Sequence, residues 1–119
     1  MSSCSCSCYE YLESGRALAD EAKAAQAAFE AGEPEGVFEH LESWHSYAEV
    51  LALRSKVLYD LLYPATESGA WVQAKEATQN PDEFWNRNQD PDQVATAALA
   101  ALVALSDNIY QMIRQDCAR

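Results

Sequence analysis

Apolar and small residues follow a helical repeat near the start of the chain. They recur at alternating spacings of four and three residues, the pattern that places side chains on one face of an α-helix. The centre of the segment, residues 17–28, is rich in alanine, which favours helix and allows close packing. We expect a first helix from about Tyr9 to Ala31, ended by Gly32 in the left-handed conformation. Its stripe is Tyr11, Gly15, Leu18, Ala22, Ala25 and Phe29.

A second stripe begins directly after a tight turn. Pro34 stands where the first residue of a helix belongs, and Glu35 follows it near the positive end of the helix dipole. The alternation then continues to Leu62, which predicts one long helix that ends at Pro64. A second apolar row widens the face, as in a bundle core. The stripe is Val37, Leu41, Trp44, Ala48, Leu51, Ser55, Leu58 and Leu62, and the second row is Phe38, Leu53, Val57 and Leu61.

The rest of the chain predicts one broken helical segment and one long helix. A third segment is expected from Thr66 or Ser68, as its cap, to about Thr78. Asn-Pro at residues 80–81 starts a further piece barely two turns long, and its aromatic residues are expected to cover the core. Asp-Pro-Asp at residues 90–92 starts the last helix, which should reach about Cys117. The apolar set of this helix is Val94, Ala98, Leu99, Leu102, Val103, Leu105, Ile109, Met112 and Ile113.

These elements predict an all-α fold. Short links force neighbouring helices to run antiparallel, so we expect an up-and-down bundle of four helices with the third one broken. A three-helix bundle with a long structured connection is the alternative. No segment alternates strictly between apolar and polar residues, so a sheet is not expected. Residues 1–8 are interpreted as a flexible Ser/Cys-rich head, and residues 9–119 as a single helical bundle domain.

Negative charge is concentrated in the first half of the chain. The net charge is −11, and the segment from Glu10 to Glu49 holds ten of the 19 acidic residues against only Arg16 and Lys23. Hydrophobic residues make up 49% of the sequence, so the charge decorates a folded surface. Direct binding to nucleic acid is not expected, because phosphate contacts need clustered Lys and Arg. No signal peptide and no membrane span is expected, which indicates a cytoplasmic protein.

Three cysteines alternate with serine at the start of the chain. We expect a cluster of reduced thiols there, because such near neighbours close loops too short for ordinary disulfides. In an extended segment, alternate side chains point to one side and would supply three soft ligands for zinc or copper. A fourth ligand could come from the other end of the chain if the two termini meet. The alternative function is therefore a thiol-based metal-binding or redox protein, and its predicted ligands are Cys4, Cys6, Cys8 and Cys117.

The sequence does not indicate an enzyme. Glu42 and His45 have the Glu-x-x-His spacing of di-iron bundle proteins, but that site needs the pair twice with two further glutamates. Glycine-rich phosphate loops and nucleophile elbows are absent from the sequence. No catalytic residue is predicted, and no cofactor is expected in the main interpretation.

The main functional hypothesis is recognition by an acidic surface. The first two predicted helices form a hairpin whose polar positions are mostly carboxylates, and such a face gains on-rate and specificity against a basic surface. We expect a non-enzymatic adaptor or inhibitor that docks on a basic surface of a partner protein, including one that itself binds nucleic acid. The long second stripe would also allow a homodimer. The predicted contact residues are Glu30, Glu33, Glu35, Glu39, Glu42, Tyr47 and Glu49.

Overall fold

The chain folds into helices alone over the part that the structure describes. The computed structural model describes residues 4–118, with side chains from Cys8 onward. No strand occurs within these residues, and the all-α prediction is confirmed. The helices are α1 (Cys4–Glu30), α2 (Pro34–Arg54), α3 (Lys56–Glu67), α4 (Ala70–Gln79), α5 (Pro81–Asn86) and α6 (Pro91–Ala118).

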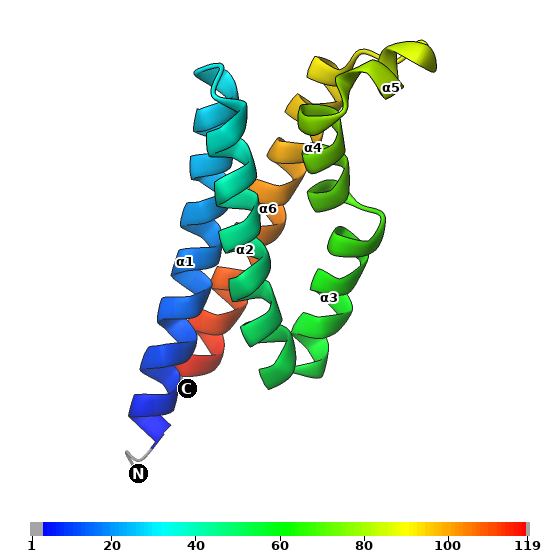
Figure 1. Cartoon of the computed structure of the whole chain (residues 1–119). Coiled ribbons are helices and arrows are strands. Elements are labelled where there is room, and N and C mark those ends of the chain that lie inside the picture. Colours follow the sequence, from blue (N-terminus) through cyan, green and yellow to red (C-terminus); the bar gives the residue numbers. More distant parts are fainter. Residues whose placement is uncertain (1–3, 119) are drawn as a thin grey trace.

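The helices form an antiparallel up-and-down bundle of four rods (Figure 1). Helices α1, α2 and α6 are three of the rods, and α3 followed by α4 makes the broken third rod. Helix α1 packs against α2 and α6, and α4 packs against the same two helices from the other side. The start of α1 and the end of α6 therefore lie at one end of the bundle (Figure 1).

The turn between α1 and α2 has the predicted chemistry. Gly32 adopts a φ of 74°, the left-handed region that glycine enters without a steric penalty. The amide of Glu33 reaches back to the carbonyl of Ala28 at 2.9 Å and so satisfies one of the open carbonyls at the helix end. Pro34 is the first residue of α2, a position where the N–H group that proline lacks would have no partner within the helix. This turn places the acidic start of α2 at one end of the bundle.

The second helix ends ten residues before the predicted stop at Pro64. Helix α2 ends at Arg54, Ser55 adopts an extended conformation, and the chain reverses into α3. The hydroxyl oxygen of Ser55 accepts a hydrogen bond from the amide of Leu58 at 3.3 Å, which caps the new helix. Pro64 lies inside α3 on its exposed side, where the freed carbonyl one turn earlier is open to water.

The predicted break at Asn80-Pro81 is confirmed, since α4 ends at Gln79 and α5 begins at Pro81. A further break, which was not predicted, lies at residues 68–69. The amides of Ser68 and Gly69 both donate to the carbonyl of Pro64, at 3.1 and 2.9 Å, and close the end of α3. Thr66 and Ser68, predicted as caps, therefore belong to the end of α3 and not to the start of a new helix. The third rod gains the residues that the prediction assigned to the second helix.

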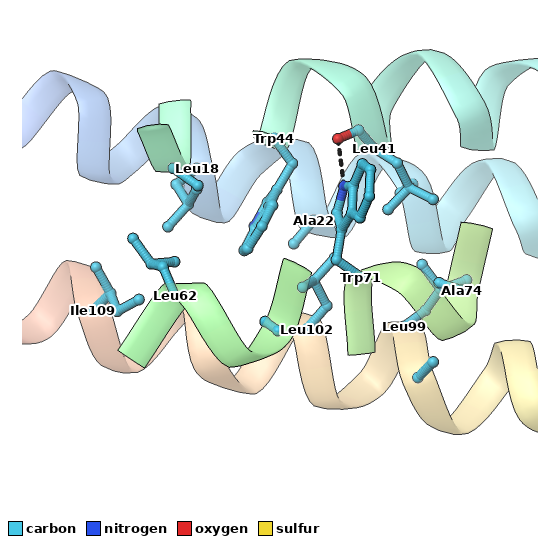
Figure 2. Close-up of a cluster of buried hydrophobic side chains, with 14 of the residues drawn as sticks. Leu18, Ala22, Leu41, Trp44, Leu62, Trp71, Ala74, Leu99, Leu102 and Ile109 are labelled. Carbon is cyan, nitrogen blue, oxygen red and sulfur yellow. Dashed lines mark hydrogen bonds between the residues drawn. The ribbon is translucent and has the colours of Figure 1, made fainter. Parts of the chain in front are cut away.

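Buried leucines, alanines and two tryptophans fill the centre of the bundle (Figure 2). The indole N–H of Trp71 donates to the carbonyl of Leu41 at 2.7 Å, shown as a dashed line in Figure 2. The indole N–H of Trp44 donates to the hydroxyl of Ser106 at 2.8 Å, so both polar groups are satisfied in the core. Gly15 allows α1 and α6 to approach closely, because an added Cβ would lie 2.8 Å from Cδ1 of Ile113.

Helix α1 begins earlier than predicted. It starts at Cys4 and not at Tyr9, so residues 4–8, expected as part of a flexible head, have a helical backbone. Residues 1–3 lie outside the described part of the chain. Since alternate residues of a helix do not share a side, the extended geometry behind the predicted triple-cysteine site does not hold from Cys4 onward.

Helix α6 is long and apolar enough to cross a membrane, judged by length and composition alone. No membrane span was expected from the sequence, because the apolar residues of α6 are interrupted by polar ones and form no continuous run. In the structure, Leu99, Leu102, Ile109 and Ile113 of this helix are fully buried in the bundle core. The core helix of a bundle can pass the same test, and here 33% of the apolar window is buried inside the protein.

Candidate functional site

Four of the predicted contact residues surround Pro34 at one end of the bundle. Glu35 and Glu39 line an open groove between the start of α2 and the end of α4. Glu30 and Glu33 line a depression of about 450 Å³ on the other side of Pro34. Neither hollow has a lysine, arginine or histidine among the described residues that line it. The lining residues shared by the two hollows are Pro34 and Thr78.

The two acids nearer the middle of α2 have partners within the protein. Glu42 lies 3.6 Å from the ammonium nitrogen of Lys75 on α4, and Lys75 also lies over the ring of Trp71, 5.0 Å from its centre. Glu49 lies 3.7 Å from Nδ1 of His45, one turn earlier. The predicted acids therefore form two groups: those around Pro34 have no ion pair with the residues that the structure describes, and those farther along α2 are paired.

Tyr47 does not join the acidic residues in the structure. It is half-buried and packs against the main hydrophobic core. Residues seven apart on a helix share a side, and His40, seven residues earlier, bonds through Nδ1 to Glu21 of α1 at 2.7 Å. Tyr47 thus faces α1, whereas Glu42 faces α4. It remains a predicted contact residue, placed apart from the others.

A groove between α2 and α3 was not predicted from the sequence. It has a volume of about 340 Å³, with Ala48, Ala52 and Leu62 among its apolar lining. The rings of Tyr59 and Tyr63 stack along it with their centres 5.3 Å apart. The complete lining set is His45, Ala48, Glu49, Ala52, Tyr59, Leu62, Tyr63, Thr66 and Glu67.

The groove is electrostatically negative. The carboxylate of Glu67 raises the pKa of the Tyr63 phenol from its ordinary value of 10.0, because a second negative charge beside it is unfavourable. Partial desolvation and the neighbouring Tyr59 act in the same direction. The sequence carried one signal for this arrangement: Tyr59, Tyr63 and Glu67 are four residues apart and share a side of α3.

The cysteines form a disulfide where reduced thiols were expected. Cys8 of α1 is bonded to Cys117 of α6, with the two Cα atoms 5.8 Å apart. Reduced thiols were expected because pairs within the head are too close to bridge, whereas the alternative hypothesis also allowed a stable thiol pairing between the chain ends. The antiparallel bundle brings the distant Cys117 beside Cys8 and so forms that pairing. The side chains of Cys4 and Cys6 lie outside the described part. Within that part, no group of three or more His, Cys, Asp or Glu side chains converges as a metal site.

The Glu42 and His45 pair does not form a shared site. Glu42 points to Lys75 of α4, while the ring of His45 packs beside Trp71 with the ring centres 4.9 Å apart. The carboxylate that lies beside His45 is Glu49 on its own helix, 3.7 Å from Nδ1. A residue pair held by two different neighbours does not converge on one metal ion.

Comparisons of the chain with protein-family models, with curated proteins and with solved structures find no match in any of the three. The function is therefore inferred from the surfaces described above.

Proposed function

We propose that the protein is a non-enzymatic, cytoplasmic adaptor or inhibitor that docks on a basic surface of a partner protein. The observation that carries the proposal is the set of four carboxylates around Pro34, which lines two hollows without a basic residue among the described lining residues. A surface of this kind is costly in the free protein, because like charges repel one another. A complementary basic surface offsets that cost on binding.

The charge of this surface supports a role in binding a basic partner protein. Spaced carboxylates accelerate encounter with a basic partner and disfavour acidic ones. They also occupy the positions where a basic surface would otherwise hold the phosphates of a nucleic acid, which makes inhibition by occupancy a direct consequence of binding. The groove at Glu35 and Glu39 is lined by α2 and α4, and Glu30 lies at the end of α1, so these three carboxylates are held on helices, while Glu33 is the residue before α2.

The test is charge reversal with a matched control. Glu35→Lys with Glu39→Lys should abolish capture of basic partners by the immobilised protein and flatten the salt dependence of any remaining binding. Asp82→Lys with Glu83→Lys makes the same change in net charge on α5, and both pairs include an acid in the first turn of a helix. The control variant should retain the partners.

Two results would count against the proposal. Partners retained by the Glu35 and Glu39 variant would show that this surface is not the docking site. Equal loss in both variants would show that net charge alone controls capture. Circular dichroism must show unchanged helicity for either comparison to be valid.

The Cys8–Cys117 disulfide favours a second candidate function, a thiol-based redox role. Reduction would add two electrons and two protons from an external dithiol and give two free thiols at the joined chain ends. Metal binding by these two residues would require the reduced form, because the thiolate is the ligand. Elemental analysis and thiol counting on protein purified without chelator test both forms. Four unreactive, metal-free cysteines or four permanently free thiols would each exclude a reversible switch.

A further inference from the structure

The groove between α2 and α3 combines three properties in one small volume. Its floor is apolar, its wall is the stacked pair Tyr59 and Tyr63, and its rim carries the carboxylates of Glu49 and Glu67. The described lining residues include no lysine or arginine, and His45 is the one titratable base among them. A hollow of about 340 Å³ is near the lower end of the range for ligand sites, so it suits a single long side chain and not a large ligand.

The two tyrosines are open to solvent. Tyr59 is 43% exposed and Tyr63 is 47% exposed. The core takes Leu58 and Leu62 from this helix instead. An aromatic pair left on the surface beside carboxylates resembles the anchors of binding surfaces, where tyrosine gives a large contact area with little loss of side-chain entropy.

The chemistry of the groove selects a guanidinium group. A planar cation stacks on an aromatic face and forms paired hydrogen bonds with a carboxylate, and arginine does both. Inside the protein, arginine is the cation found over tyrosine rings: Arg54 lies over Tyr11 at 5.3 Å and Arg114 over Tyr110 at 5.8 Å, whereas Lys75 lies over Trp71 at 5.0 Å. Lysine, a compact and strongly hydrated ammonium, would gain less from the stacked rings.

We propose that the groove between α2 and α3 receives an arginine side chain of a basic partner, stacked on Tyr59 and Tyr63 and paired with Glu49 or Glu67. This inference rests on the proposed function, since it names the residue type by which the basic partner is recognised. The acids around Pro34 supply general attraction, and the groove supplies preference for arginine over lysine.

The experiment compares two probe peptides, acetyl-hexaarginine amide and acetyl-hexalysine amide, at one ionic strength. The measured quantity is the ratio of their dissociation constants, obtained by calorimetry for each variant. The unaltered protein should bind the arginine peptide about fivefold more tightly, a ratio typical of one cation–π contact. Tyr59→Ala with Tyr63→Ala should bring the ratio close to one. Tyr59→Phe with Tyr63→Phe keeps the rings and should keep the preference.

A matched variant separates the groove from the general acidic surface. Glu35→Gln with Glu39→Gln should weaken both peptides alike and leave the ratio unchanged. Glu67→Gln, a change of nearly constant size, should lower the ratio and tests the groove even if the double alanine variant fails to fold. A ratio near one in the unaltered protein, or one insensitive to both the tyrosine and Glu67 variants, would overturn the groove proposal alone. Absence of binding by either peptide would overturn the proposed function as well.

Discussion

The two halves of the third rod use their apolar residues differently. Helix α4 directs Trp71, Ala74 and Ala77 into the bundle, and it packs against both α2 and α6. Helix α3 also buries three residues, but it packs chiefly against α2 and α4. It leaves a further set of large apolar side chains exposed on its flanks, namely Val57, Tyr59, Leu61 and Tyr63.

This difference separates the residues that hold the fold from those available for recognition. A half-covered helix contributes less to the free energy of folding and retains apolar surface that a partner can bury. Leu53, at the end of α2 beside the corner that leads into α3, is 89% exposed and extends this apolar region. We infer that α4 mainly supports the bundle, whereas α3 mainly presents a surface.

The largest expected effect compares one aromatic residue from each half. Trp71→Ala should lower the free energy of unfolding by about 3–5 kcal/mol, because it empties a buried site and removes the hydrogen bond to Leu41. Tyr63→Ala should cost about 0.5 kcal/mol or less, since half of the side chain already contacts water. Urea denaturation of the two variants measures both values. Similar losses would show that α3 supports the fold as much as α4 does.

Reduction of the disulfide should affect the α3 end of the bundle more than the α4 end. Cys8 and Cys117 join α1 to α6 at the end where α3 gives the looser cover (Figure 1). Breaking a bond that closes a loop of 109 residues should cost about 2–4 kcal/mol. Hydrogen exchange with and without reductant should show faster exchange in the outer turns of α1 and α6. A Cys8→Ser, Cys117→Ser variant should no longer respond to reductant. A loss of protection in these turns no larger than the general loss in the bundle core would contradict the local effect.

The sequence was sufficient to predict the fold class and the first turn. Gly32 and Pro34 are residues whose backbone restrictions allow few alternatives, so the pattern there was unambiguous. The corner at Ser55 was missed because the apolar stripe crosses it without a change of phase. Leu51 and Leu58 both face the core from antiparallel helices, and periodicity alone cannot distinguish that from one straight helix.

The candidate site was predicted in part. The acids around Pro34 could be placed together because they are close in sequence and flank one turn. The partners of Glu42 and Cys8, and the groove beside Tyr63, depend on contacts across the bundle. The groove depends on the corner at Ser55, which brings α3 back along α2, so the error at that corner also concealed the groove.

A substitution at Gly69, in the break between α3 and α4, tests whether the stability of the bundle depends on the backbone geometry of this break. A Cβ added at Gly69 would lie 2.9 Å from the carbonyl oxygen of Pro64 and 3.0 Å from Cα of Ala65, and both are backbone atoms that cannot rotate away. Gly69→Ala should therefore cost about 1–3 kcal/mol. Ser68→Ala, at the exposed neighbour, is the control and should stay within about 0.5 kcal/mol. Thermal unfolding distinguishes the two, and a harmless Gly69→Ala would mean that the break can relax.

The smallest effect concerns the cap that separates α3 from α2. Ser55→Ala removes the hydrogen bond from the Leu58 amide to the side-chain oxygen, with an expected loss of about 1 kcal/mol, while Ser55→Asp should preserve most of it. Alanine also favours a helical backbone at residue 55, so the variant lowers the barrier to joining α2 and α3 into the single long helix that the apolar repeat predicted. Because that joined form would expose Leu58 and Leu62, the core should resist it and the helical content should stay unchanged. An increase in molecular mass would instead indicate that the opened hairpin pairs with a second copy, and the separation of α3 as an independent surface would then depend on this one hydroxyl.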